Sequence, residues 1–553
     1  MIPLLAIYVM ILFGSNQCVR KKSKGEIMTA PDFHSALEQN AKSEKSEGYV
    51  PDRIFLKFEQ DSISYLEMNQ RANRIAHALL ELGAEPGSGL AIMLPNIPEF
   101  LEVFFATQKI SVYAVPVNTG LKGRSLAHVL SHSEVRFLVI HQDYLEEFQA
   151  IQNHVPELKT IVVHRDVPPA EQVTPGRALA YELLSDHPGS ENPNLELDPQ
   201  AICLIMYTSG TTGPAKGVVY RYNRTGLDLV VQGSKLIIQP GDIIYTCLPL
   251  FHMNALFLST QWAIHSRNTL ALGRRFSASR FWEEIRGHRA TVFNALGAMI
   301  PILLKQPRRS DDSKNPVRLV FSAACPAKAW CEFEERFSLK IWELYGAVDG
   351  GTFSCINVGN APVGSIGKPG VEHRLVDEDD NDCPPGTPGE LIFRITNPSR
   401  QTVEYFKDQA ETRKKMSHGW LRTGDLFYRD EQGFLYFVDR KTDGMRRRGE
   451  NVSAFEVESA VCLHPDVLEC AATGVPSDLS EDDIFIAVVP KPGVRLEPQD
   501  LYLFLEKHLA FYQLPRYIEI MEALPKTPTQ KVQKSLLKQR GPGPEAWDRD
   551  KAS

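Results

Sequence analysis

A stretch between residues 207 and 220, YTSGTTGPAKGVVY, gathers groups that suit an anion. Glycines let backbone N–H groups approach an anion closely, hydroxyl groups donate hydrogen bonds, and a lysine adds a mobile positive charge. The stretch therefore predicts a loop that holds a phosphate chain. Its candidate contact residues are Thr208, Ser209, Gly210, Thr211, Thr212, Gly213 and Lys216.

The spacing of this loop excludes the commonest phosphate-binding loop. A Walker A element reads G-x-x-x-x-G-K-[S/T], whereas Lys216 follows Ala215 and precedes Gly217. The apolar run AICLIMY, 201–207, is typical of a buried strand, and GVV, 217–219, begins a return strand. For a generic loop of this composition, a hairpin without any ligand is the alternative.

The order of residues in YTSGTTGPAKGV resembles the signature of the adenylate-forming superfamily, which includes acyl-CoA synthetases, luciferases and the adenylation domains of peptide synthetases. Members activate a carboxylate with ATP as an acyl adenylate. The resemblance covers nearly the whole chain and implies that the loop residues bind ATP and AMP. The other motifs of the family can be compared one by one.

The segment ELYGAVDGG, 343–351, resembles the family's Tyr-Gly-x-Thr-Glu motif. The resemblance implies that Tyr345 stacks on adenine, with Gly346 beside it, and that the Asp349 carboxylate holds Mg²⁺ from the glutamate position. Val348 stands where the family has a threonine that touches the α-phosphate. Because valine donates no hydrogen bond, that contact is missing or replaced.

Two further segments resemble the parts of the family that bind adenine and ribose. Ala324 lies in SAACP, 322–326, at the place of the adenine-binding segment. Asp425 ends WLRTGD, 420–425, and the resemblance assigns to it the two ribose hydroxyl groups. Arg440, in an Asp-Arg pair that follows, would contact the ribose or a phosphate.

The carboxyl-terminal residues resemble the mobile domain of the family. Thr442 takes the hinge position, where a small polar residue can absorb the backbone rotation of domain closure. Gly449 would leave room for the pantetheine arm of CoA. The segment LPKTPTQKVQKSLL, 524–537, implies that Lys531 is the catalytic residue, with Gln530 where the family has glycine. A long cation there can stabilise charge on the α-phosphate as the carboxylate attacks.

Two segments resemble the walls of the acyl pocket. His252, in LPLFHMNAL, is placed where a Phe-His pair borders the carboxylate. It could orient the acid or be a core residue, and both interpretations stay open. Asn294 and Gly297, in NALGAMI, supply a second wall with room for an acyl group.

Strands and helices alternate along most of the chain, which predicts a doubly wound α/β fold. SYLE, 64–67, matches a capping box at the start of a helix. Short strands broken by Gly, Pro and Asp indicate a small β-barrel-like antiparallel unit over about 363–439, and a small, mobile α+β domain follows. The predicted division is a tail at 1–29, an adenylate-forming domain at 30–439, a carboxyl-terminal domain at 440–540 and a polar, disordered tail at 541–553.

Composition limits the partners. A formal net charge of −7 indicates no nucleic-acid partner, because it implies no domain-wide basic surface. The nine cysteines include no C-x-x-C pair, so neither a zinc site nor a disulfide framework is indicated. This favours a reducing compartment and a cytoplasmic location. The apolar run IPLLAIYVMILF, 2–13, is too short to span a bilayer; it is a weak membrane anchor, a signal-like segment or an extension before a start at Met28, and we favour the last.

These motifs together predict an ATP-dependent carboxylate:CoA ligase that uses Mg²⁺, releases pyrophosphate and forms a thioester from an acyl-AMP. FLYFVDR and RRGENVSAFEVE look most like the branch of crotonobetaine/carnitine-CoA ligases and medium-chain acyl-CoA synthetases. One alternative is a stand-alone adenylating enzyme that loads a carrier-protein thiol. A nucleotide-binding scaffold that has lost activity is the other, favoured by Val348, Thr442 and Gln530 and opposed by Lys216, Asp425, Arg440 and Lys531.

Overall fold

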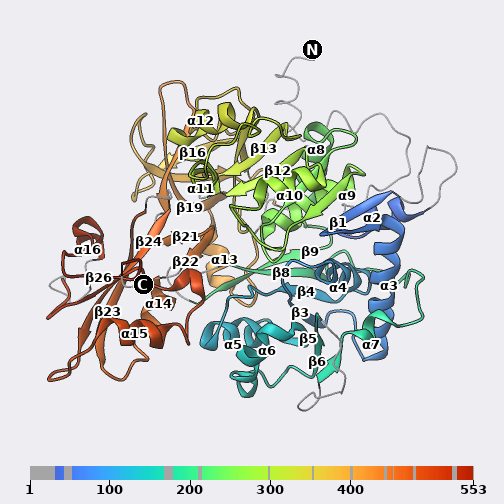
Figure 1. The fold of residues 1–553 in the computed structure, drawn as a ribbon, viewed down its shortest axis with the longest axis horizontal. Coiled ribbons are helices and arrows are strands. Elements are labelled where there is room, and N and C mark those ends of the chain that lie inside the picture. Colours follow the sequence, from blue (N-terminus) through green and yellow to red (C-terminus); the bar gives the residue numbers. More distant parts are fainter. Residues whose placement is uncertain are drawn as a thin grey trace.

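The structure is a computed structural model that describes residues 32–42, 53–166, 178–208, 214–296, 299–350, 354–398, 403–440, 445–452, 454–477, 481–525, 532 and 534–551. Figure 1 shows a large amino-terminal part, coloured blue to orange, and a smaller carboxyl-terminal part in darker orange and red at the lower left. The predicted membrane-related run at 2–13 lies outside the described residues.

A seven-stranded sheet carries the loop at 207–220. All neighbouring strands in it are parallel except β8 and β9, which are antiparallel. Its order is β7 (Ala178–Ala180), β6 (Thr160–His164), β5 (Val135–His141), β3 (Gly89–Met93), β4 (Tyr113–Pro116), β8 (Ile202–Thr208) and β9 (Lys216–Arg221). The loop therefore joins two strands at the edge of this sheet, as the sequence predicts.

Helices cover both faces of this sheet, and strand β3 shows why. Leu90 and Ile92 point into one core with helices α3 (Tyr65–Glu81) and α4 (Pro98–Lys109), whereas Ala91 and Met93 point into another with α5 (Gly123–His132) and α6 (Leu145–Gln149). Alternate residues of a strand face opposite sides, so a strand apolar on both sides needs two helical layers. The short elements nearby are η1 (Gln142–Tyr144), η2 (Gln152–His154) and α7 (Glu182–Ser185).

The first long helix begins as its capping box predicts. The Ser64 hydroxyl accepts a hydrogen bond from the Glu67 backbone N–H at 3.0 Å. The helix ends before Gly83, whose φ of 85° is in the left-handed region that glycine tolerates.

A second sheet of eight strands shares a core with the first. Its order is β15 (Ser354–Asn357), β14 (Lys340–Gly346), β13 (Leu319–Ala323), β12 (Val292–Leu296), β10 (Ile243–Thr246), β11 (Thr269–Leu272), β1 (Ile54–Phe58) and β2 (Asp61–Ser64). Its helices are α2 (Ser35–Ala41), α8 (Leu227–Ile237), η3 (Asn254–Gln261), α9 (Trp262–His265), α10 (Phe281–His288), α11 (Met299–Leu304) and α12 (Ala327–Phe337). Because β12, β13 and β14 are parallel, their carboxyl ends meet at one edge, where ligands of open α/β sheets bind.

An antiparallel sheet of five strands follows, at the upper left of Figure 1. Its strands are β16 (His373–Val376), β17 (Gly389–Arg394), β19 (Trp420–Arg429), β18 (Met416–Ser417) and β20 (Leu435–Arg440), and helix α13 (Gln409–Lys415) precedes β18. This sheet is the small β-rich unit that the turn-rich sequence predicts.

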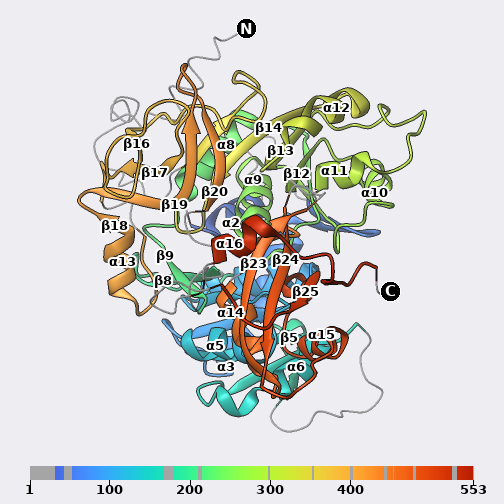
Figure 2. The same ribbon diagram turned by 90° about the vertical axis from the view of Figure 1, so that its left-hand side faces the viewer.

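The carboxyl-terminal part is α+β, and its sheet faces the viewer in Figure 2. It contains the hairpin β21 (Met445–Arg447) and β22 (Glu450–Val452), and a sheet of β23 (Val467–Pro476), β24 (Asp482–Pro490), β25 (Tyr517–Ile520) and β26 (Trp547–Asp548). The helices are α14 (Ala454–Val461), α15 (Pro498–Leu505), η4 (Phe511–Gln513) and α16 (Lys534–Arg540).

The polar tail corrects one expectation. Trp547 and Asp548 form β26 and pair with β25, so the prediction of disorder is wrong for residues 541–551. The ring of Trp547 lies 5.2 Å from that of Tyr502, and Arg516 contacts Asp548 at 3.3 Å. Sequence reasoning missed this strand because two residues carry no period.

Candidate active site

The structure describes about half of the predicted site. Thr208, Lys216, His252, Asn294, Ala324, Tyr345, Gly346, Asp349, Asp425 and Gly449 lie within the described residues. Ser209, Gly210, Thr211, Thr212, Gly213, Gly297, Thr442 and Lys531, and the side chain of Arg440, lie outside them.

Lys216 begins β9 directly opposite Thr208, at the open end of the loop. Its ammonium group lies 2.5 Å from a carboxylate oxygen of Glu411, on α13, and 5.5 Å from the centre of the Tyr405 ring. Gly217, the next residue, is needed for close packing, because a Cβ there would lie 2.8 Å from a methyl carbon of Ile205. Lys216, which the sequence predicts to bind a phosphate, is therefore paired with the Glu411 carboxylate in this structure.

Asp349 lies close to the same segment. Lys415 Nζ is 2.7 Å from Asp349 Oδ2, and the Tyr405 hydroxyl donates a hydrogen bond to that oxygen at 2.5 Å. Val348 packs against the main core and its carbonyl accepts a hydrogen bond from the Tyr220 hydroxyl at 2.8 Å. The Asp349 carboxylate is thus aimed at the region of Lys216, with a cation already beside it.

Tyr345 and Asp425 meet directly. The Tyr345 hydroxyl donates a hydrogen bond to Asp425 Oδ2 at 2.6 Å, and its ring packs edge-on against Phe427 at 4.9 Å. Burial, together with the charge of Asp425, raises the pKa of the Tyr345 phenol, so the phenol keeps its proton and donates it. The backbone of Asp425 also lies opposite the backbone of Arg440, where strands β19 and β20 pair. The residues predicted for adenine and ribose are therefore neighbours.

Ala324 follows β13 with φ 64°, and this turn is fixed by a buried acid. The backbone N–H of Cys325 donates a hydrogen bond to Glu343 Oε1 at 3.0 Å. Burial raises the pKa of Glu343 to about 7, and the backbone hydrogen bonds that it accepts lower it less. Glu343 thereby ties the expected adenine segment to β14.

His252 and Asn294 line the neighbouring region. His252 Nε2 lies 2.7 Å from Glu450 Oε1, which belongs to β22 of the carboxyl-terminal part. Asn294 donates a hydrogen bond to Asn254 Oδ1 at 2.6 Å, and its own Oδ1 is buried with no hydrogen-bond partner among the described residues. The His252 side chain is 37% exposed and meets the other part of the chain, so it is not a core residue, and its role in orienting the acid stays a prediction.

Gly449 lies in the turn between β21 and β22 and touches the amino-terminal part. A Cβ on Gly449 would lie 2.2 Å from Leu296 Cδ1, and its φ is 80°. Leu296 ends β12, two residues after Asn294. The glycine predicted for CoA therefore sits against the predicted acyl wall.

The segment that follows Lys531 belongs to a different face of the carboxyl-terminal part. Val532 packs against the cluster of Ala471, Val475 and Phe485, and Lys534 Nζ lies 2.6 Å from Glu458 Oε1. Helix α16 lies at the left edge of Figure 1 and toward the viewer in Figure 2, away from the amino-terminal part. The hairpin with Gly449, not α16, contacts the predicted acyl wall of the amino-terminal part.

Sequence reasoning missed four residues of this region. Tyr405, Glu411, Lys415 and Glu450 contact predicted residues, but the sequence indicated no role for them. Glu450 lies in the family-like segment RRGENVSAFEVE, and the other three lie in the charge-rich stretch EYFKDQAETRKK, 404–415.

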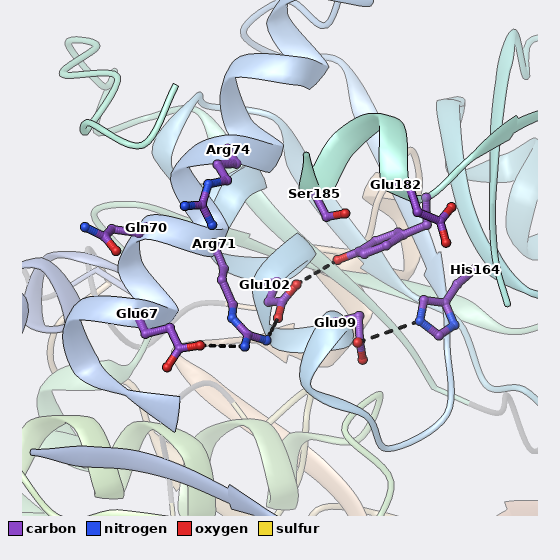
Figure 3. A pocket seen from close by; sticks show the side chains of 10 residues that line it. Glu67, Gln70, Arg71, Arg74, Glu99, Glu102, His164, Glu182 and Ser185 are labelled. Atoms are coloured by element: carbon purple, nitrogen blue, oxygen red, sulfur yellow. Dashed lines mark hydrogen bonds and ion pairs between the residues drawn. The ribbon is translucent and has the colours of Figure 1, made fainter. Parts of the chain in front are cut away.

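A cavity of about 520 Å³ lies elsewhere, between α3, α4, β6 and α7 (Figure 3). Arg71 donates hydrogen bonds to Glu67 at 2.6 Å and to Glu102 at 3.0 Å, and the Tyr181 hydroxyl donates one to Glu102 at 2.9 Å. Burial raises the pKa of Glu102, and Arg71 opposes this. These contacts join three helices, and none of the lining residues belongs to the predicted site.

Two family models match this chain. The model described as AMP-binding enzyme covers residues 43–400, and that described as AMP-binding enzyme C-terminal domain covers 456–531. The chain belongs to the AMP-binding enzyme family. The enzyme is 30% identical over 506 residues to the crotonobetaine/carnitine–CoA ligase of Salmonella arizonae, an alignment that covers 89% of this chain and 97% of that relative.

Solved structures agree on the fold. The o-succinylbenzoate CoA synthetase of Bacillus subtilis, bound with a product analogue, superposes with a TM-score of 0.76 at 24% identity, covering 93% of this chain and 99% of that one. The amide bond synthetase of Marinactinospora thermotolerans gives 0.75 at 22%, covering 89% and 98%. These structures confirm the α/β fold, and the family models with the curated relative confirm the resemblance to the adenylate-forming superfamily and the acyl-CoA ligase class. Among the described residues, no helix is long and apolar enough to cross a membrane.

Proposed function

We propose that this acyl-CoA ligase activates a short, polar carboxylic acid with ATP and Mg²⁺, and transfers the acyl group from acyl-AMP to the thiol of CoA. The contact of Gly449 with Leu296 carries the proposal. It sets the expected CoA residue beside the expected acyl wall, with Tyr345 and Asp425 already joined at the expected nucleotide position. ATP and CoA as substrates favour a cytoplasmic location.

Two ion pairs would open when the nucleotide binds. Lys216 would exchange the Glu411 carboxylate for a phosphate oxygen, and Asp349 would exchange Lys415 for Mg²⁺. Carboxylate oxygens are the ligands that Mg²⁺ prefers, so Asp349 fits the ion. Bound there, the ion would neutralise charge on the phosphates. Lys415 would then be free to offset the charge of the released pyrophosphate.

Polar side chains favour a small acid over a long aliphatic one. Asn294 presents a buried carboxamide oxygen without a partner among the described residues, and His252 is held by Glu450. A buried acceptor that is left unpaired costs about 1–3 kcal/mol. An acid with a hydrogen-bond donor or a positive charge would relieve this cost. The named relative acts on crotonobetaine and carnitine, which are acids of this polar class.

The thiol that accepts the acyl group distinguishes the main alternative functions. The amide bond synthetase shares this fold, so the fold alone does not specify a CoA thiol. A carrier-protein thiol is the second candidate. Gly449 and its contact with the acyl wall favour a narrow pantetheine arm as the acceptor. CoA and a carrier protein both have this arm, but only CoA can act without a protein partner, so turnover with free CoA distinguishes them.

The test is pyrophosphate release with ATP, Mg²⁺ and a panel of betaines, short acids and medium-chain acids, each with and without CoA. We expect turnover with short polar acids and CoA, and little turnover without CoA. Lys531→Ala, which should abolish acyl-adenylate formation, is the inactive control. Turnover with medium-chain acids only would overturn the proposed acid class. A single round of pyrophosphate release that free CoA does not convert into continued turnover would favour the carrier protein.

A further inference from the structure

Two cysteines of the carboxyl-terminal part lie side by side. Cys462 follows helix α14 and is exposed, and Cys470 lies on strand β23 and is half-buried. Their sulfur atoms are 3.6 Å apart, and Cys470 Sγ also donates a hydrogen bond to the Glu458 carbonyl at 3.5 Å. By contrast, Cys203, Cys247 and Cys355 are buried in the core of the amino-terminal part.

We propose that Cys462 and Cys470 form a reversible redox site that takes a small disulfide, such as glutathione disulfide, as its oxidant. The two sulfur atoms are already close enough that rotation about the side-chain bonds can bring them to bonding distance. One sulfur is open to solvent, and its neighbour is placed to react second.

The chemistry of the pair suits this role. Contact with the Cys470 thiol lowers the pKa of the Cys462 thiol to about 7, whereas burial raises the pKa of the Cys247 thiol to about 12. A thiolate is the reactive form of cysteine, and exposed thiols of low pKa react first. Cys462 is therefore the attacking group.

The reaction balances in two exchange steps. The Cys462 thiolate attacks one sulfur of glutathione disulfide, forms a mixed disulfide and releases one glutathione thiolate. Cys470 then loses its proton, attacks the Cys462 sulfur and releases the second glutathione. The protein loses two protons and two electrons, and glutathione disulfide takes them up and is reduced to two glutathione molecules.

A chain of contacts joins this pair to helix α16, which follows Lys531 in the sequence. The Glu458 carbonyl accepts hydrogen bonds from the Cys462 backbone N–H at 2.9 Å and from Cys470 Sγ. The Glu458 carboxylate holds Lys534 at 2.6 Å, and Lys534 begins helix α16. Drawing the sulfurs together would take Cys470 Sγ from the Glu458 carbonyl and shift this anchor. This consequence rests on the proposed function, whereas formation of the disulfide does not.

The first test treats the full-length protein with glutathione disulfide and maps its peptides by mass spectrometry. We expect a Cys462–Cys470 linkage that dithiothreitol reverses. Cys470→Ser should retain glutathione on Cys462, because the second step is blocked. Cys331 is an exposed cysteine outside the pair and serves as the control, so Cys331→Ser should leave the Cys462–Cys470 linkage unchanged. Glutathionylation of Cys331 before any linkage appears would overturn the proposal.

The second test compares oxidised and reduced protein in the two half-reactions. We expect oxidation to slow acyl-adenylate formation by about tenfold, the size expected for one lost charge-assisted contact. Thioester formation from synthetic acyl-AMP and CoA should be unchanged, and Cys462→Ser should be insensitive to the oxidant. A linked protein with an unchanged adenylation rate would refute the regulatory part. Reduced protein without adenylation activity would instead refute the proposed function and leave the first test standing.

Discussion

At the residue scale, the contact between Tyr345 and Asp425 gives the sharpest prediction. Asp425→Ala removes the acceptor of both ribose hydroxyl groups, so the KM for ATP should rise by about 10- to 100-fold, since hydrogen bonds to a charged group contribute about 1.5–3 kcal/mol. Tyr345→Phe is the control, because it keeps the ring for adenine and removes only the 2.6 Å hydrogen bond to Asp425. Steady-state kinetics with ATP varied would measure both. Equal rises in the two variants would argue against a ribose contact at Asp425.

Glu343 makes stability depend on pH. Burial raises its pKa from 4.5 to about 7, so between these values the folded protein holds a proton that the unfolded chain has lost. The free energy of unfolding must therefore fall as pH rises through this window. Compared with Glu343→Gln, which keeps the acceptor for Cys325, the wild-type protein should lose on the order of 3 kcal/mol more between pH 5 and pH 8. Denaturation curves at both pH values measure this, and parallel losses would show that Glu343 ionises normally.

The sequence alone predicted roles for nucleotide residues, and these roles stay predictions, but it did not indicate the present partners of these residues. Tyr345 and Asp425 carry family motifs, so their roles could be inferred from residue order. The pairs Lys216–Glu411 and Asp349–Lys415 join segments that are far apart in sequence. Such pairs depend on how the sheets are packed, which no local pattern contains.

At the element scale, the turn between β21 and β22 predicts which half-reaction needs it. Gly449→Ala should slow thioester formation from synthetic acyl-AMP by about tenfold or more, because its Cβ would collide with Leu296 while adenylation uses the nucleotide side of the site. Gly493→Ala is the matched control, with φ of 79° and nothing within 4 Å of the new Cβ. Measuring acyl-AMP and acyl-CoA in quenched reaction mixtures distinguishes adenylation from thioester formation. A larger loss of adenylation than of thioester formation would contradict this placement.

Strand β26 gives a second prediction at this scale. Truncation after Arg540 should destabilise the carboxyl-terminal sheet by about 1–3 kcal/mol, because it removes the Trp547 packing and the Asp548 contact to Arg516. Lys551→Ala should change little, since exposed ion pairs contribute little. Thermal unfolding measures both, and equal melting temperatures for truncated and full-length protein would show that β26 adds no stability.

Long elements were predictable where their periods were clear. The helix that starts after Ser64 and the buried strand at 202–208 both formed as their patterns indicate. Strand β26 was missed because its pairing with β25, rather than its own sequence, holds it in place. The closeness of Cys462 and Cys470 was equally hidden, since it depends on α14 packing against β23.

At the scale of the whole molecule, the two faces of the carboxyl-terminal part explain how one site could run two reactions. The hairpin with Gly449 faces the amino-terminal part, and α16, which follows the Lys531 segment, lies on the outer side. The family resemblance implied a mobile domain and a hinge at Thr442. Because Val532 and α16, which follow Lys531 in the sequence, lie on this outer side, we expect that the predicted rotation must turn this side toward the nucleotide for adenylation, and that the present arrangement is the one used for thioester formation.

The most direct test of this account is Lys531→Ala in the two half-reactions, measured separately. Acyl-adenylate formation from ATP and acid should be abolished, because the variant lacks the cation that stabilises charge on the α-phosphate. Synthetic acyl-AMP and CoA should still give thioester at nearly the wild-type rate, because that half uses the face with Gly449. A folded variant in which both half-reactions fall equally would contradict domain alternation and the assignment of Lys531.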